Sequence, residues 1–429
     1  MKKLINKIIT TYKNLNVSAK ATIWFIFSNI FVKGISVFTL PIFTRLLTTE
    51  EYGNYSLYLS WLSIFTVITS LNLYYGAFNN ALNKYKDEKS RFNYIASMQG
   101  IITVLVIIVA IIYFCNINYW NDQIGLPTPV IILMFIELIV SPSMLFWTGK
   151  QRFEFKYKSM VGLTIFKSLL NPILSIILVF AWPSNKDFAR IIAIVIVEIL
   201  TSGVLYVYHF IKGNSFYNKE HWKYALKFNI PLLPHYLSGT LLNQSDRIMI
   251  EKLVGKTEVA LYSVAYNIGM LALIFTNALN SSLTPWMYQQ LNNKNYNHIK
   301  NNMNLILTFL ATLIILLINF APEIIWFFGS EKYMNSIYVI PPIATSVFFI
   351  FMYNIFAIPQ MYYEYNKFMP IASVLAAGLN ILLNYIFIPI YGYVAAAYTT
   401  LFCYILYSVG HFIVTKYICS KVTPGIDLF

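Results

Sequence analysis

The segment 368–415 contains no Lys, Arg, Asp or Glu, and this uncharged run constrains the fold of the chain more than any other feature. A helix needs about 20 apolar residues to cross the hydrocarbon core of a bilayer, so the run is too long for one crossing. Pro389 and Gly392 supply a break, because both residue types interrupt helices. The run therefore predicts two successive membrane-spanning helices.

Apolar segments of similar length recur along the whole chain. The sequence is 58% hydrophobic and 11% charged, whereas soluble domains carry about 25% charged residues. We expect an all-α integral membrane protein with about twelve transmembrane helices. The predicted spans are 21–45, 54–76, 94–116, 126–148, 159–182, 189–211, 225–249, 259–286, 302–321, 335–361, 368–389 and 392–415.

Basic residues cluster between these spans rather than in one patch. The clusters precede the first span and follow the second, fourth and sixth: Lys2, Lys3, Lys7, Lys13 and Lys20; Lys84, Lys86, Lys89 and Arg91; Lys150, Arg152, Lys156 and Lys158; Lys212, Lys219, Lys223 and Lys227. The positive-inside rule then places both termini and the even-to-odd loops in the cytoplasm. After residue 230 the bias weakens, and the topology rests on the span count. The distribution of the +14 net charge favours loops that face anionic lipid and argues against nucleic-acid binding.

A short motif occurs once in each half of the chain. Glu51, Tyr55 and Ser56 recur as Glu258, Tyr262 and Ser263, at the start of the second and eighth predicted spans. Six spans per half make the repeat parallel, since both halves then enter the membrane from the same side. We expect two six-helix bundles, 1–213 and 214–429, related by a pseudo-two-fold axis along the membrane normal around a central cavity.

Four ionisable residues fall inside predicted spans of the first half: Lys33, Glu137, Lys167 and Glu198. A charge at the bilayer centre costs about 2.5–3.5 kcal/mol, so such residues face a cavity or a partner. Lys33 shares one helix face with Asn29 and Ser36. This stripe is either a seam between packed helices, with Lys33 paired to Glu137 or Glu198, or a face that meets substrate or ions.

The second half combines one charged pair with amides. Asp246 and Arg247 are adjacent, so they point to different faces, and they form either an interfacial cap or part of a site. Pro231 and Pro234 should kink or break the helix of the same span. His235 in that span suits hydrogen-bonded packing better than a proton relay. Two further faces carry amides and hydroxyls, which bind sugars or join helices: Ser373, Asn380 and Asn384, and Asn277 and Ser281.

Three segments resemble Wzx-type oligosaccharide flippases, which share a superfamily with multidrug and toxin extrusion transporters and lipid II flippases. They are the segments from Pro41 to Tyr58, from Asn243 to Ile250 and from Gly392 to Thr400. The likeness in plan covers nearly the whole chain. It implies translocation of an undecaprenyl-diphosphate-linked oligosaccharide, destined for O-antigen, capsule or a related polymer, from the cytoplasmic to the outer leaflet of a bacterial inner membrane.

This resemblance assigns roles to the polar residues. We expect the diphosphate to meet Lys33, Lys167, Arg45 and Arg247; a coupling ion, H⁺ or Na⁺, to bind at Glu137, Glu198 or Asp246; and sugar to contact Asn29, Asn277, Asn380 and Asn384. Rocking of the bundles would give alternating access. We expect no catalytic residue, no metal site and no cofactor. The expected partners are membrane lipid and other polysaccharide-assembly proteins.

Three other functions remain open. A multidrug exporter of the same superfamily would have a smaller cavity. A lipid II flippase would be expected to have two more helices. A membrane polysaccharide polymerase or glycosyltransferase is the enzyme alternative, and such enzymes usually have a sizeable outer loop, whereas every loop predicted here is short.

Overall fold

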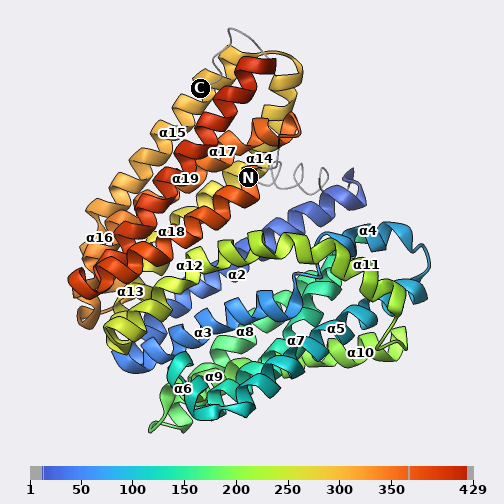
Figure 1. The fold of residues 1–429 in the computed structure, drawn as a ribbon, viewed down its shortest axis with the longest axis vertical. Coiled ribbons are helices and arrows are strands. Elements are labelled where there is room, and N and C mark those ends of the chain that lie inside the picture. The colour runs from blue at the N-terminus through green and yellow to red at the C-terminus, as the bar shows by residue number, and fades with distance from the viewer. Residues whose placement is uncertain (1–11, 13, 366–367, 423–429) are drawn as a thin grey trace, which may run out of the picture. The chain divides into compact units, whose positions relative to one another are not determined.

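The computed structural model describes residues 12, 14–365 and 368–422, and these residues fold into helices (Figure 1). Four of the lysines used for the orientation, Lys2, Lys3, Lys7 and Lys13, lie outside the described residues, as do both chain ends. The elements are α2 (Val17–Leu46), α3 (Thr49–Ser70), α4 (Ala77–Lys84), α5 (Glu88–Cys115), α6 (Ile117–Ile124), α7 (Thr128–Phe153), α8 (Tyr157–Ala181), α9 (Lys186–Glu198), η1 (Ile199–Gly203), α10 (Val204–Gly213), α11 (Lys219–Asn229), η2 (Ile230–Leu232), α12 (Leu233–Leu253), α13 (Lys256–Gly269), α14 (Ala272–Asn292), α15 (Tyr296–Asn319), α16 (Ala321–Phe328), η3 (Glu331–Val339), α17 (Ile340–Tyr362), α18 (Phe368–Tyr391) and α19 (Tyr393–Val422).

The predicted all-α membrane architecture is confirmed. Among the described residues, 10 helical segments are long and apolar enough to cross a membrane. The predicted spans 54–76 and 225–249 correspond to α3 and α12, which have 22 and 21 residues but a more polar composition. Every predicted span therefore has a helical counterpart. The break between the last two spans lies at Gly392, whose positive φ of 68° is a conformation that favours glycine.

Three predicted spans differ from the observed helices. The eighth predicted span, 259–286, is divided between α13, which ends at Gly269, and α14, which begins at Ala272. The second predicted span continues to residue 76, but α3 ends at Ser70 and a turn precedes α4. The seventh predicted span begins at residue 225, but α11 ends at Asn229 and α12 begins at Leu233 after the single 3₁₀ turn η2. Pro231 lies in that turn and cannot donate a helical hydrogen bond, which explains the expected break.

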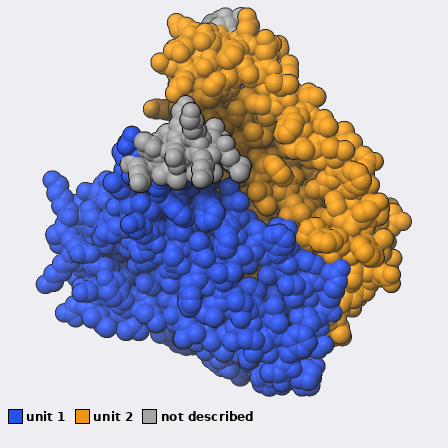
Figure 2. All heavy atoms as spheres, turned by 180° about the vertical axis from the view of Figure 1, so that it is seen from behind, with its two compact units in different colours: residues 1–46, 65–233 blue, residues 47–64, 234–429 orange. Residues whose placement is uncertain are grey.

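The chain forms two compact units, drawn in different colours in Figure 2. Unit 1 comprises residues 1–46 and 65–233, and unit 2 comprises residues 47–64 and 234–429. Helix α3 thus contributes its first part to unit 2 and its last turns to unit 1. The predicted bundles, 1–213 and 214–429, follow the order of helices along the chain, whereas the compact units are defined by contacts in space. The predicted repeat stays a prediction.

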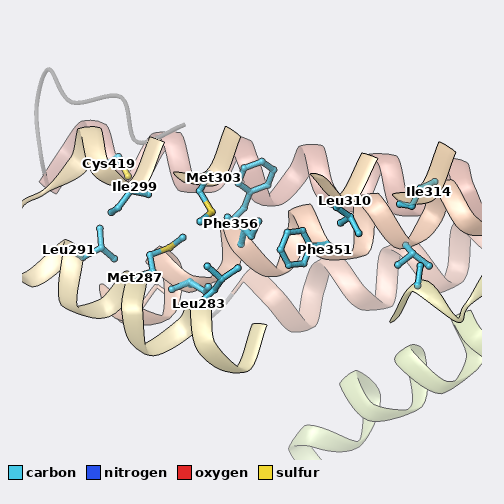
Figure 3. Packing of buried hydrophobic residues seen from close by; sticks show 14 of the residues in the cluster. Leu283, Met287, Leu291, Ile299, Met303, Leu310, Ile314, Phe351, Phe356 and Cys419 are labelled. Carbon is cyan, nitrogen blue, oxygen red and sulfur yellow. The ribbon is translucent and has the colours of Figure 1, made fainter. Parts of the chain in front are cut away.

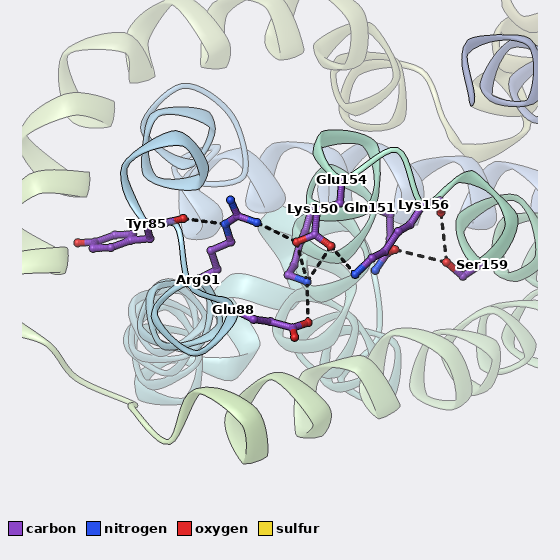
Figure 4. A network of polar contacts seen from close by, with 8 residues as sticks. All are labelled: Tyr85, Glu88, Arg91, Lys150, Gln151, Glu154, Lys156 and Ser159. Atoms are coloured by element: carbon purple, nitrogen blue, oxygen red, sulfur yellow. Dashed lines mark hydrogen bonds and ion pairs between the residues drawn. The ribbon is translucent and has the colours of Figure 1, made fainter. Parts of the chain in front are cut away.

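Within unit 1, an ion-pair network joins the start of α5 to the end of α7 and the start of α8 (Figure 4). Lys150 has an exposed fraction of 1%, and its ammonium lies 3.0 Å from a carboxylate oxygen of Glu154 and 3.3 Å from one of Glu88. Glu154 also pairs with Arg91 at 3.1 Å and with Lys156 at 2.7 Å.

The same end of unit 1 holds a third basic segment. Helix α11, which carries Lys219, Lys223 and Lys227, packs against α4 and α5, and the His221 ring lies 5.5 Å from the ring of Tyr85. The basic segments after the second, fourth and sixth predicted spans therefore meet at one end of unit 1. The positive-inside pattern predicts this convergence for loops on one side of a membrane.

In unit 2, helices α14, α15, α17 and α19 surround an apolar core (Figure 3). Its buried side chains include Leu283, Met287, Phe351 and Leu310. Lipid tails are as apolar as these residues, so close van der Waals packing rather than exclusion of water favours this association.

The two copies of the repeated motif lie against each other in unit 2. A Cβ built on Gly53 in α3 would overlap the carbonyl oxygen of Lys256 at the start of α13, so only glycine permits this approach. Glu51 of the motif closes a capping box, because its carboxylate accepts from the Thr48 amide at 2.7 Å and its own amide donates to the Thr48 hydroxyl at 3.2 Å. Part of the motif thus serves to start α3.

Candidate functional site

A buried polar cluster in unit 2 surrounds Asp246, and we name it the Asp246 cluster. Helices α18 and α19 form a hairpin around Gly392 and pack along each other (Figure 1), which brings the amides of one helix to the hydroxyls of the other. The cluster consists of Asp246 from α12, Tyr262 from α13, Asn380 and Asn384 from α18, and Thr399 and Thr400 from α19.

Asp246 is the acceptor at the centre of the cluster. Its carboxylate accepts hydrogen bonds from Asn384 Nδ2 at 2.6 Å, from Thr400 Oγ1 at 2.9 Å and from the Tyr262 hydroxyl. The side chain is fully buried. Burial of a carboxylate is costly unless its oxygens are hydrogen-bonded, and three donors reduce that cost here.

The other members of the cluster bond to one another. Asn384 Nδ2 donates to Asn380 Oδ1 at 3.2 Å, and Asn380 Nδ2 donates to Thr400 Oγ1 at 3.2 Å. Thr399 donates to the amide oxygen of Asn384. The cluster therefore gathers one carboxylate, two amide oxygens and two threonine hydroxyls. Oxygen groups of this kind suit a proton or a hard cation better than they suit a soft metal.

Arg247 has its own environment on the other face of α12. Its guanidinium donates to Ser263 Oγ at 3.1 Å and to the Asn243 carbonyl oxygen at 2.8 Å, and it lies 4.4 Å from the centroid of the Tyr266 ring. The neighbouring Asp246 and Arg247 thus point to different partners, as the sequence predicts. Arg247 is buried, and its donors are engaged within unit 2.

Unit 1 places Lys167 of α8 beside Glu198 of α9. The ammonium lies 2.5 Å from one carboxylate oxygen of Glu198, and Ser202 Oγ donates to the other oxygen at 2.6 Å. Ser202 belongs to η1, a short π-helical segment that begins directly after Glu198. Such π-bulges are rare and often occur at functional sites. The alternative in which Glu198 pairs with Lys33 is not what the structure shows.

The polar stripe of α2 is exposed. Asn29, Lys33 and Ser36 all have exposed side chains, whereas a seam between packed helices would bury them. Among the described residues, the Lys33 ammonium has no ion pair or hydrogen bond. The choice between the two interpretations of this stripe stays a prediction.

The remaining predicted residues are Glu137, Arg45, Asn277 and His235. Glu137 is buried on α7. Arg45 lies exposed in the last turn of α2, where it donates to the Pro41 carbonyl oxygen at 3.0 Å. Asn277 is exposed on α14. His235 lies 2.9 Å from Ser373 Oγ, an arrangement that fits hydrogen-bonded packing.

Sequence reasoning missed several members of these groups. Tyr262 belongs to the repeated motif, and Thr399 and Thr400 end the small-residue segment that begins at Gly392. From the sequence, all three residues indicate the fold rather than a site. Ser202 follows Glu198 by one helical turn, and that spacing was a usable signal. The sequence does not indicate that Thr400 contacts Asp246, because only the tertiary packing of the hairpin of α18 and α19 brings the two side chains together.

Two family models and a curated relative match this chain. The model of a family described as polysaccharide biosynthesis protein matches residues 18–291, and the MatE model matches residues 231–386. A Haemophilus influenzae protein described as "Lsg locus putative protein 1" is 24% identical over 349 residues, which cover 79% of this chain and 83% of that protein.

Two solved structures share the fold. An inward-facing multidrug resistance MATE family transporter of the MOP superfamily has a TM-score of 0.71 and 13% identity, over 93% of this chain and 96% of its own. The lipid II flippase MurJ, in an inward closed conformation, has a TM-score of 0.71 and 17% identity, over 93% of this chain and 87% of its own. At these identities the two structures establish the fold alone.

Proposed function

Because the chain belongs to the polysaccharide biosynthesis protein family and has the fold of MOP superfamily transporters, we propose that it is a flippase for a lipid-linked oligosaccharide. The substrate is an undecaprenyl-diphosphate-linked repeat unit, which moves from the cytoplasmic to the outer leaflet of a bacterial inner membrane. The glycan serves O-antigen, capsule or a related polymer, and the protein works beside other polysaccharide-assembly proteins with both termini in the cytoplasm.

The observation that carries the proposal, beyond family membership, is the exposed Lys33 within the α2 span. A lipid tail can remain in hydrocarbon during translocation, but a diphosphate cannot, so a cation must meet it. Lys167 is already neutralised by Glu198, and Arg247 is buried among its own partners. Lys33 is therefore the first of the four candidate cations, with exposed Arg45 at the end of the same helix as the second.

The Asp246 cluster is the best candidate for the coupling ion. Its carboxylate is surrounded by neutral donors that can reorient when a proton or Na⁺ arrives. Glu198, by contrast, already has a cationic partner in Lys167. Binding of the ion would alter the hydrogen bonds that join α12 to α18 and α19, and alternating access would follow from that change. In this conformation Asn380 and Asn384 serve the cluster, and their contact with sugar stays a proposal for another conformation.

A leaflet assay in cells tests the proposal directly. Cells that lack the protein should accumulate lipid-linked oligosaccharide that is protected, in intact spheroplasts, from a membrane-impermeant periodate reagent. Wild-type protein should restore reagent access. The proposal requires no covalent change in the substrate during translocation, so the oligosaccharide must have the same mass in wild-type and deficient cells before the reagent is added.

Other results would favour the other functions. Accumulation of single repeat units in the outer leaflet would point to a polymerase or glycosyltransferase. Accumulation of lipid II on the cytoplasmic leaflet would point to a lipid II flippase. Unchanged oligosaccharide together with drug sensitivity would point to a multidrug exporter. Each of these outcomes contradicts the proposed substrate.

A further inference from the structure

Helix α11 has three distinct faces. Ala225 and Asn229 are buried against the rest of unit 1. Lys219, Lys223 and Lys227 form an exposed edge with a spacing of one turn. Tyr224 and Phe228 lie on the next edge, where their exposed fractions are 43% and 36%. Apolar or aromatic residues beside a row of lysines are typical of helices that lie in a membrane surface.

The helix is held in place by side-chain to backbone hydrogen bonds. Trp222 Nε1 donates to the Ser97 carbonyl oxygen on α5 at 3.0 Å, and Asn229 Nδ2 donates to the Leu71 carbonyl oxygen at 3.0 Å. Asn218 caps the first turn by accepting from two backbone amides. The lysine edge is therefore presented in a fixed orientation before any ligand arrives.

The described part of the chain does not neutralise the charge of this surface. Among the described residues, none of the three lysines has an ion pair. Exposed Lys84 at the end of α4 adds a further positive charge, because α4 packs against α11. Glu220 is the acidic residue of α11 itself, and the nearby Glu88 is engaged by Lys150.

We propose that α11 is a lipid-binding surface, which takes the phosphate headgroups of anionic phospholipids on Lys219, Lys223 and Lys227 while Tyr224 and Phe228 enter the acyl boundary. The helix lies between the spans that end at Gly213 and begin at Leu233, at the end of unit 1 where the basic segments converge. Juxtamembrane lysines attract anionic lipid at such a position. This site is separate from the proposed translocation residues on α2, α8 and α12.

Lipid retention by the full-length protein tests this inference. Purified protein is exchanged into detergent with equimolar phosphatidylglycerol and phosphatidylcholine, and the retained lipids are counted by native mass spectrometry. Wild-type protein should retain phosphatidylglycerol preferentially, and high salt should reduce the preference. The triple variant Lys219→Gln, Lys223→Gln, Lys227→Gln should lower the ratio of the two lipids by at least about fivefold.

Two control variants separate a local site from a general charge effect. Lys→Arg changes at the same three positions should keep the preference, which also shows that the helix tolerates substitution. Lys294→Gln, Lys300→Gln and Lys416→Gln remove the same charge from unit 2 and should leave the ratio unchanged. Hydrogen exchange of residues 216–232 should slow in phosphatidylglycerol nanodiscs relative to phosphatidylcholine nanodiscs.

Two results would overturn the inference. The first is an unchanged lipid ratio in the glutamine variant of α11; if this variant also loses binding of an acidic soluble protein, α11 is a protein-docking helix. The second is an equal fall of the lipid ratio in the unit 2 variant, which would reflect net charge alone.

Discussion

Each unit contains a buried carboxylate, and the two carboxylates are stabilised in different ways. In unit 1, Glu198 is neutralised by Lys167, and a serine hydroxyl supports the pair. In unit 2, Asp246 has no cation among its hydrogen-bond donors and is surrounded by tyrosine, asparagine and threonine. An ion pair has little need of a further ion, whereas a carboxylate held by neutral donors can accept one.

This difference assigns different expected roles to residues that the sequence groups together. Glu198 and Asp246 are both candidates for ion coupling, yet the first already has its counter-charge in the resting structure. Lys33 and Lys167 are both candidates for the diphosphate, yet only the first is exposed and unpaired among the described residues. Four substitutions test this comparison, from the largest expected effect to the smallest.

Lys167→Gln should give the largest effect, on stability. It leaves Glu198 buried without its cation, and breaking a buried pair from one side costs about 3 kcal/mol or more. The thermal midpoint of the purified protein should fall clearly. The double variant Lys167→Gln, Glu198→Gln should recover most of the loss, because it removes both charges. Equal midpoints for the single and double variants would show that the pair is not coupled.

Asp246→Asn should abolish coupling while the fold is retained. Asparagine keeps the shape of the side chain but not its charge, and interactions with a charged group are worth about 2 kcal/mol, or about thirtyfold in ion affinity. Flipping in proteoliposomes should lose its dependence on the H⁺ or Na⁺ gradient. The matched controls Glu137→Gln and Glu198→Gln in unit 1 should keep that dependence. Gradient dependence that survives in Asp246→Asn and vanishes in Glu198→Gln would reverse the comparison.

The sequence predicts the fold better than the site, for physical reasons. Span length and charge-free runs such as 368–415 follow directly from the thickness of a bilayer, so the helices could be placed. A break at Pro231 is expected from the sequence, but the predicted span 225–249 begins before it, because the apolar pattern continues across the break. The polarity of Asp246 was evident, but its donors come from three other helices, and only tertiary packing brings Thr400 and Tyr262 to it.

Lys33→Gln should weaken substrate binding without loss of stability. An exposed lysine contributes little to folding, whereas a charge-assisted contact with a phosphate is worth about tenfold in affinity. The apparent KM for lipid-linked oligosaccharide should rise by about tenfold in proteoliposomes, and the thermal midpoint should stay near that of the wild type. Lys33→Arg should retain binding. A lower thermal midpoint together with an unchanged apparent KM would show that Lys33 stabilises the fold and does not bind the substrate.

Glu154→Gln should give the smallest effect and a characteristic pH dependence. Burial raises the pKa of the Glu154 carboxyl, but hydrogen bonds and charges from Lys156 and Lys150 outweigh burial and hold this pKa below its ordinary value of 4.5. A depressed folded-state pKa stabilises the fold fully above the unfolded pKa, and this contribution is lost as the pH falls through the folded value. Because Glu88 still pairs with Lys150 after the change, and because Glu88 and Lys156 are exposed to solvent, we expect about 1 kcal/mol or less.

The measurement is the thermal midpoint of the purified protein from neutral pH to below pH 4.5. The wild type should lose more stability on acidification than Glu154→Gln, and high salt should narrow the gap between them. Glu220→Gln, at an exposed carboxylate on α11, is the matched control and should follow the wild type. Transport in Glu154→Gln should stay near the wild-type rate at neutral pH, because Glu154 follows the end of α7 and is not a candidate residue for the substrate or the ion. A large loss of transport in Glu154→Gln would show that the end of unit 1 moves during the transport cycle. The Glu154 network would then respond during transport as we expect of Asp246, and it would not be a fixed set of ion pairs like that of Glu198.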